Sequence, residues 1–122
     1  MRVLIVDDHM LIRDALRSLL EAHGVEIVGE AGNGREAVAL AHIHRPDVVL
    51  MDLMMPVLDG FEAIKRIKSK PETASIPVVA VTALSRPTDQ ERAIASGAEN
   101  YLCKPFDIEE LSTMIEHYAS NS

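Results

Sequence analysis

Residues 48–52, VVLMD, join an unbroken apolar run to an aspartate. The same arrangement occurs at residues 3–8, VLIVDD, and in a related form at residues 78–82, VVAVT. Short runs that are apolar throughout are typical of parallel strands covered by helices on both faces. These stretches therefore predict three central strands of a parallel sheet, each followed or ended by a polar side chain.

Strand-like runs alternate with helix-length amphipathic stretches, as expected of five βα units wound into an α/β fold. We expect strands at Val3–Val6, Val25–Glu30, Val48–Met51, Val78–Val81 and Asn100–Leu102.

Local signals mark the helix ends. An Asn or Asp followed three residues later by Glu indicates a helix start at Asn33, Asp59 and Asp107. Pro87 suits the first turn of the fourth helix, and Gly24 and Gly97 suit left-handed ends of the first and fourth helices.

The composition limits the classes of protein to consider. The 122 residues, 48% of them hydrophobic, suffice for a single domain over residues 1–122, with 119–122 as a tail or the start of a linker. A formal charge of −7 argues against direct nucleic acid binding. The apolar run at residues 3–6 is too short for a signal peptide or membrane insertion, and the only cysteine, Cys103, cannot form an internal disulfide. We therefore expect a cytoplasmic protein.

Chemistry in such a sheet is expected beyond the carboxyl ends of the strands. The residues that follow or end strands there are Asp7, Asp8, Asp52, Thr82 and Lys104. Carboxylates brought close together repel, and oxygen donors with room for water favour Mg2+, with Mn2+ as a substitute. By themselves Asp7 and Asp8 could equally begin a helix, where acids favour the positive end of the dipole. A third acid after a central strand favours the metal site.

The spacing of these residues resembles that of the CheY-like receiver domains of bacterial response regulators, over essentially the whole chain. The matching positions are Val6-Asp7-Asp8, residues 51–60 (MDLMMPVLDG), Thr82, Tyr101 and Lys104-Pro105. The resemblance implies a flavodoxin-like (βα)5 three-layer sandwich with a parallel sheet in the order 2-1-3-4-5. It also implies a cis peptide before Pro105.

The resemblance further implies a role for each site residue. Asp52 would accept a phosphoryl group, while Asp8, Asp52 and the backbone carbonyl of Met54 would bind Mg2+ directly and Asp7 through water. Lys104 would offset phosphoryl charge, and Thr82 with Tyr101 would form the conformational switch. The protein would not be an enzyme beyond its own phosphorylation and autodephosphorylation. Apolar residues Met54 and Leu84 would shield the acyl phosphate from water and give it a long lifetime.

The first helix suggests a partner surface. Its core stripe can be written as Ile12, Ala15, Leu16, Leu19 and Leu20, which leaves Met10 and Leu11 exposed beside the acids. As in resembling receivers, we expect these two residues to contact a sensor histidine kinase or histidine phosphotransfer protein. Output to a downstream target or effector domain is expected through the fourth helix, fifth strand and fifth helix. The five histidines are interpreted as surface or helix-cap residues.

The sequence supports three alternative functions less well. A flavodoxin-type cofactor binder needs a hydroxyl- and glycine-rich phosphate loop where this chain has Asp7-Asp8-His9. An aspartyl-phosphate hydrolase needs an acid or base close behind the nucleophile, where this chain has Leu53-Met54. A phosphorylation-independent receiver-like interaction module would keep the fold but not the reaction.

Overall fold

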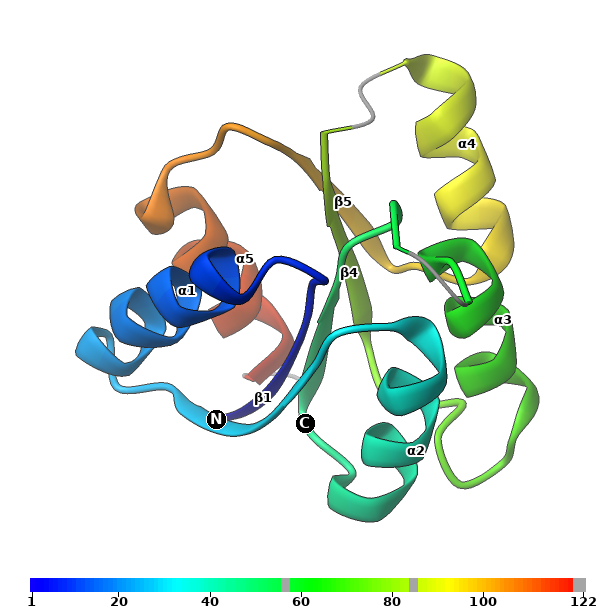
Figure 1. Cartoon of the computed structure of the whole chain (residues 1–122), viewed down its shortest axis with the longest axis horizontal. Helices are drawn as coiled ribbons and strands as arrows, with labels where there is room; N and C mark the ends of the chain where they lie inside the picture. Colours follow the sequence, from blue (N-terminus) through cyan, green and yellow to red (C-terminus); the bar gives the residue numbers. More distant parts are fainter. Residues whose placement is uncertain (56–57, 84–85, 120–122) are drawn as a thin grey trace.

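The strands form one parallel sheet. The computed structural model describes residues 1–55, 58–83 and 86–119. The strands are β1 (Arg2–Val6), β2 (Glu26–Ala31), β3 (Val48–Met51), β4 (Val78–Thr82) and β5 (Asn100–Cys103). Their order, β2-β1-β3-β4-β5, confirms the predicted topology and places the three apolar runs at the centre of the sheet (Figure 1).

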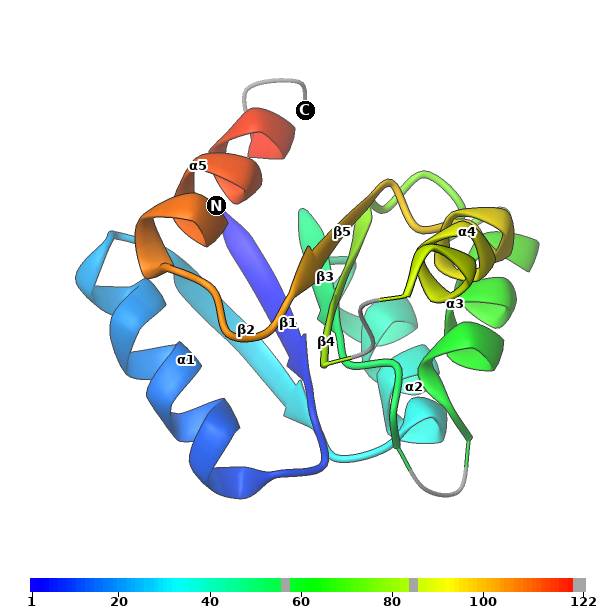
Figure 2. The same cartoon turned by 90° about the horizontal axis from the view of Figure 1, so that it is seen from above.

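Five helices cover the two faces of this sheet. They are α1 (Met10–Ala22), α2 (Gly34–His44), α3 (Gly60–Ser69), α4 (Pro87–Ser96) and α5 (Ile108–Ala119). Helices α1 and α5 lie on one face, and α2, α3 and α4 lie on the other (Figure 2). Each face buries its own aliphatic cluster, as expected for a parallel sheet covered on both sides.

The predicted helix starts and ends are confirmed. The side chains of Asn33 and Asp59 accept hydrogen bonds from the backbone N–H groups of Glu36 and Glu62, each at 2.9 Å. Helix α5 begins directly after Asp107. Pro87 occupies the first turn of α4, and Gly24 (φ 82°) and Gly97 (φ 119°) adopt left-handed conformations after α1 and α4.

Strand β2 lies one residue later than predicted. The N–H of Val25 donates to the carbonyl of Leu20 at 3.1 Å, so this N–H is bonded to the last turn of α1 and not to the sheet. At the other end, the Ala31 carbonyl accepts from the N–H of Asp7 at 3.0 Å, which extends the pairing toward the acids. β1, β4 and β5 are each longer by one residue than predicted, and β3 has the predicted bounds.

The predicted core stripe of α1 was partly wrong. Leu16 and Leu20 are buried and Ile12 is partly buried, but Ala15 and Leu19 are exposed. A helix that touches a sheet on one side only buries a stripe narrower than the five residues proposed.

Some predicted features lie outside the described residues: Pro56 and Val57 of the strand-three motif, Leu84, and residues 120–122 of the tail. Within the described part of the chain, no helix has the length and apolar character needed to cross a membrane.

Candidate active site

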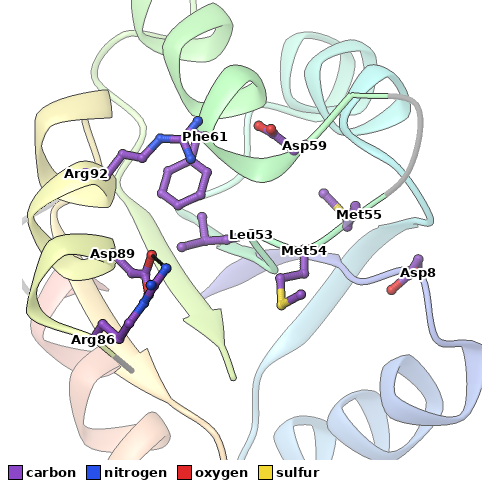
Figure 3. Close-up of a pocket in the computed structure, with 9 residues that line it drawn as sticks. All are labelled: Asp8, Leu53, Met54, Met55, Asp59, Phe61, Arg86, Asp89 and Arg92. Atoms are coloured by element: carbon purple, nitrogen blue, oxygen red, sulfur yellow. Dashed lines mark hydrogen bonds and ion pairs between the residues drawn. The ribbon is translucent and has the colours of Figure 1, made fainter. Parts of the chain in front are cut away.

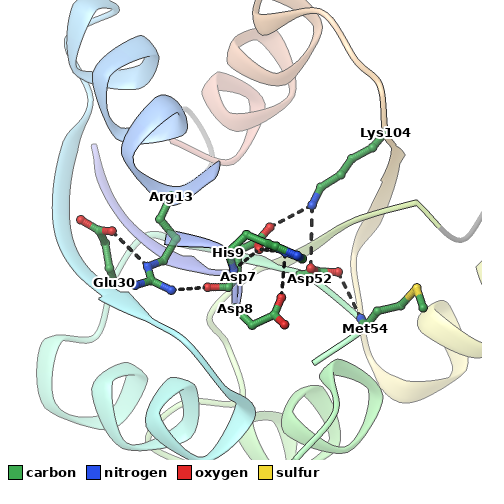
Figure 4. Close-up of polar contacts among 8 residues, drawn as sticks. All are labelled: Asp7, Asp8, His9, Arg13, Glu30, Asp52, Met54 and Lys104. Carbon is green, nitrogen blue, oxygen red and sulfur yellow. Dashed lines mark hydrogen bonds and ion pairs between the residues drawn. The ribbon is translucent and has the colours of Figure 1, made fainter. Parts of the chain in front are cut away.

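The acids after β1 and β3 meet at one edge of the sheet. The backbone N–H of Asp52 donates to the carbonyl of Val6 at 2.9 Å, which joins the two strand ends. One potential ligand atom from each of Asp7, Asp8 and Asp52 lies within 4.8 Å of the others, together with one from His9. The predicted convergence of the three acids is therefore confirmed (Figure 4).

Lys104 reaches this cluster from the loop after β5. Its Nζ lies 2.8 Å from Asp7 Oδ2 and 3.8 Å from Asp52 Oδ2. The N–H of Lys104 donates to the Thr82 carbonyl at 2.8 Å, and the peptide bond between Lys104 and Pro105 is cis, as predicted. The lysine thus places one positive charge beside two of the three carboxylates.

Asp52 is buried at the end of the central strand β3, with 6% of its surface exposed. Burial raises the pKa of its carboxyl group, and repulsion from Asp7 and Asp8 raises it further. The Met54 N–H, 3.1 Å from Asp52 Oδ1, and the charge of Lys104 act in the opposite direction. Burial and repulsion together outweigh these two contacts, so the fold disfavours the ionised carboxylate unless a further cation is present.

A glycine sets the packing behind Asp52. A Cβ on Gly60, the first residue of α3, would collide with the backbone carbonyl of Asp52 and the Cα of Leu53. Only a residue without a side chain lets α3 approach the end of β3 this closely. Asp59, the N-cap before it, fixes where the helix starts.

Two pockets open around the acids. One, of about 320 Å3, lies over Asp52 and is lined by His9, Ile12, Asp52, Met54, Ala83 and Lys104. The other, of about 560 Å3, extends from Asp8 and Met54 toward α4, where Arg86 and Arg92 face it (Figure 3). The exposed side chain of Met54 borders both pockets.

The two predicted switch residues lie on neighbouring strands. Thr82 is fully buried at the end of β4, and Tyr101 is partly buried on β5, opposite Ala80. The Tyr101 ring packs against the core cluster beneath α3 and α4, and its hydroxyl is buried without a hydrogen-bond partner among the described residues. Burial raises the pKa of this phenol.

The donor set fits a hard divalent cation. Three carboxylates converge, and the net effect of the surroundings raises the pKa of Asp52, which an added cation would reverse. Mg2+ commonly uses one or two carboxylates and keeps several waters, for which the pocket over Asp52 has room.

Comparison with known proteins identifies the family. Residues 3–116 match the response regulator receiver domain. The chain belongs to this family. The match therefore favours a receiver domain of two-component response regulators over a flavodoxin-type cofactor binder or an aspartyl-phosphate hydrolase.

Relatives of known type share the receiver domain. The chain is 50% identical over 115 residues to the transcriptional regulatory protein PdtaR of Mycobacterium tuberculosis, covering 94% of this chain but 55% of PdtaR. It is 39% identical to the polar-differentiation response regulator DivK of Brucella anthropi, covering 98% and 97% of the two chains. The chain thus spans about half of one relative and nearly all of another.

Among solved structures, the receiver domain of the sensor histidine kinase PA1611 from Pseudomonas aeruginosa superimposes with a TM-score of 0.90 at 29% identity, covering 98% of this chain and 97% of that one. That crystal structure has a magnesium ion coordinated in its active site cleft.

Sequence reasoning missed three residues around the acids of this receiver domain. His9, interpreted only as a surface or helix-cap residue, does hold the N-cap position of α1, but its ring also faces Asp7 and Asp8. Arg13 donates to the Asp7 carbonyl at 2.6 Å and pairs with Glu30 at 3.2 Å. Glu30 lies near the carboxyl end of β2, so the strand-end rule that found the other acids could have found it as well.

The partner surface predicted on α1 is exposed. Met10 and Leu11 are 65% and 82% exposed, and they precede the buried Leu16 and Leu20. Two exposed apolar side chains therefore lie at the end of the helix nearest the acids.

Proposed function

We propose that this receiver domain is a phosphoacceptor that takes a phosphoryl group from a histidine kinase or histidine phosphotransfer protein onto Asp52. The observation that carries this proposal is the enclosed carboxylate of Asp52 at the floor of a pocket, 3.8 Å from the Lys104 ammonium and close to two further acids. A carboxylate can act as a nucleophile and form an acyl phosphate.

In the proposed transfer, an Asp52 carboxylate oxygen attacks phosphorus while the bond to the donor imidazole nitrogen breaks. The electron pair of that bond leaves with the imidazole. The Met54 N–H holds Asp52 Oδ1 and orients the carboxylate, and Lys104 offsets negative charge on the phosphoryl oxygens. Both groups are in place before the donor arrives, so little rearrangement is required.

The metal site is proposed from the same residues. Asp8, Asp52 and the Met54 carbonyl would hold Mg2+ directly and Asp7 through water, with Mn2+ as a substitute. When bound, the ion would supply the positive charge that phosphoryl transfer between carboxylates requires. The magnesium ion in the PA1611 receiver domain supports this assignment.

The protein would act on itself and not on a separate substrate, which makes it a switch and not an enzyme. After transfer, the Thr82 hydroxyl would donate to a phosphoryl oxygen, and Tyr101 would move with it. Release of the phosphoryl group would be autodephosphorylation by water, slowed by the side chain of Met54.

Partners would use two surfaces. The phosphodonor protein would contact Met10 and Leu11 of α1, beside the pocket over Asp52. A downstream target or effector domain would contact α4, β5 and α5, where a groove of about 480 Å3 runs along Pro87, Gln90, Glu91, Ile94 and Ala95.

Intact mass spectrometry after incubation with acetyl phosphate tests the proposal. With Mg2+, the wild-type chain should gain one phosphoryl group, whereas Asp52→Asn with Mg2+ and the wild-type chain in EDTA should gain none. The variant Asp14→Asn, which removes an exposed acid of α1, is the control for charge and should be phosphorylated. If the wild-type chain gains no mass, the phosphorylation-independent interaction module becomes the better description.

A further inference from the structure

The imidazole of His9 is a nitrogen donor among the oxygens of the proposed metal site. Its Nδ1 lies 3.0 Å from Asp8 Oδ1 and 3.3 Å from Asp7 Oδ1 (Figure 4). The side chain is 66% exposed, but this nitrogen faces inward. Lys104 binds the other oxygen of Asp7, and Oδ1 also accepts a hydrogen bond from the backbone N–H of His9 at 2.9 Å.

These separations suit donors to one shared ion. Two ligand atoms that are each about 2.1 Å from a metal lie roughly 3.0–3.4 Å apart at octahedral or tetrahedral angles. The 3.0 Å between His9 Nδ1 and Asp8 Oδ1 falls in this interval, and both residues belong with Asp7 and Asp52 to a group of potential ligand atoms within 4.8 Å of one another. In a neutral imidazole that carries its proton on Nε2, Nδ1 has a free lone pair.

The kind of donor decides which ion is preferred. Carboxylate and carbonyl oxygens suit Mg2+, whereas imidazole suits Zn2+ and other first-row transition ions. Together with Asp8, Asp52 and the Met54 carbonyl, His9 would give four direct donors, the coordination number that Zn2+ adopts in proteins. Adding one imidazole to the acids should therefore strengthen Zn2+ binding much more than Mg2+ binding.

We infer that His9 is a metal ligand that gives this receiver domain a preference for a borderline transition ion, represented by Zn2+, over Mg2+. The inference rests on the proposed metal site and specifies which ion that site prefers. The ion would occupy the same acids that the phosphoacceptor reaction uses, so Zn2+ and Mg2+ would compete for them.

Calorimetric titration of the full chain with Zn2+ alone and with Mg2+ alone tests the inference. His9→Gln should reduce Zn2+ affinity, relative to Mg2+ affinity, by about tenfold or more. His42→Gln, which removes an exposed histidine of α2, is the matched control and should leave this ratio unchanged. Asp8→Asn should weaken the binding of both ions.

Any of three results would overturn the inference: an unchanged affinity ratio in His9→Gln, an equal loss in His42→Gln, or Zn2+ binding unaffected by Asp8→Asn. If His9→Gln fails to fold, imidazole nitrogen NMR of the wild-type chain tests whether His9 is a ligand. During a Zn2+ titration, the His9 signal must shift at lower Zn2+ concentrations than the signals of the other histidines. The acetyl phosphate experiment uses no Zn2+, so failure of phosphorylation and failure of His9 ligation are recognised separately.

Discussion

At the level of single residues, Asp52 is held in a position that costs stability. Its pKa is raised in the folded state, chiefly by burial, so the fold favours the protonated form. The stability of the wild-type chain should therefore fall as the pH rises from the ordinary aspartate pKa through the raised one. Asp52→Asn removes this cost and should increase the free energy of unfolding at pH 7 in EDTA by about 1 kcal/mol.

Urea unfolding monitored by circular dichroism measures this difference. The advantage of Asp52→Asn should disappear below the ordinary aspartate pKa, where both chains carry a neutral group. Asp14→Asn changes the net charge equally on an exposed surface and should leave stability within about 0.5 kcal/mol of the wild type. A less stable Asp52→Asn at pH 7 would show that the Lys104 and Met54 contacts outweigh burial.

The residues that sequence reasoning located share one property: Asp7, Asp8 and Asp52 directly follow strands, and topology alone brings strand ends together. The contacts that sequence reasoning missed depend on the direction in which side chains point. The ring of His9 turns back toward the acids because the residue has an extended N-cap conformation, φ −93° and ψ 109°, which hydrophobic periodicity does not encode. Contacts between separate loops, such as the one from Arg13 to Asp7, are equally invisible to local patterns.

At the level of elements, prediction was strongest where a run was fully apolar and weakest where a helix and a strand met. β3 has the predicted bounds because its four residues are all buried. β2 shifted because Val25 satisfies its N–H with the preceding helix. The stripe of α1 was overestimated because apolar residues such as Leu19 can face solvent.

The exposed apolar residues at the start of α1 lie where the phosphodonor protein is proposed to bind. Replacing Met10 and Leu11 together by glutamine removes exposed apolar surface and leaves the buried Leu16 and Leu20 untouched. Phosphoryl transfer from a phosphorylated histidine phosphotransfer protein should slow at least tenfold, because the few central residues that carry most of an interface's binding energy each cost more than about 1 kcal/mol when truncated. Rates of transfer to the wild-type and variant chains measure the effect.

Acetyl phosphate is the internal control for this variant, since a small donor needs no docking surface and should modify both chains alike. Ile43→Gln is the control for exposed apolar area, because Ile43 lies on α2, across the sheet. Equal loss with both donors would mean that the substitutions disturb the acids and not a docking surface.

At the level of the whole molecule, the proposed signal crosses from the acids to the face formed by α4, β5 and α5. Tyr101 buries its hydroxyl without a hydrogen-bond partner among the described residues, which costs about 1–3 kcal/mol. This penalty offsets part of the free energy gained by burying the ring, so the inward and outward positions of Tyr101 are close in energy. A modest change at Thr82 can therefore shift the population between the two positions.

Hydrogen exchange of the phosphorylated chain can detect that shift. Phosphorylation should change amide exchange in peptides covering Tyr101 and α4 by at least about threefold and leave α2 unaffected, because α2 is remote from β5. Thr82→Ala should reduce the change once exchange is normalised to the phosphorylated fraction, whereas Thr82→Ser, which keeps the hydroxyl, should retain it. An undiminished response in Thr82→Ala would mean that the signal reaches β5 by another route, since the hydroxyl is the only side-chain group of Thr82 able to donate to the phosphoryl oxygens.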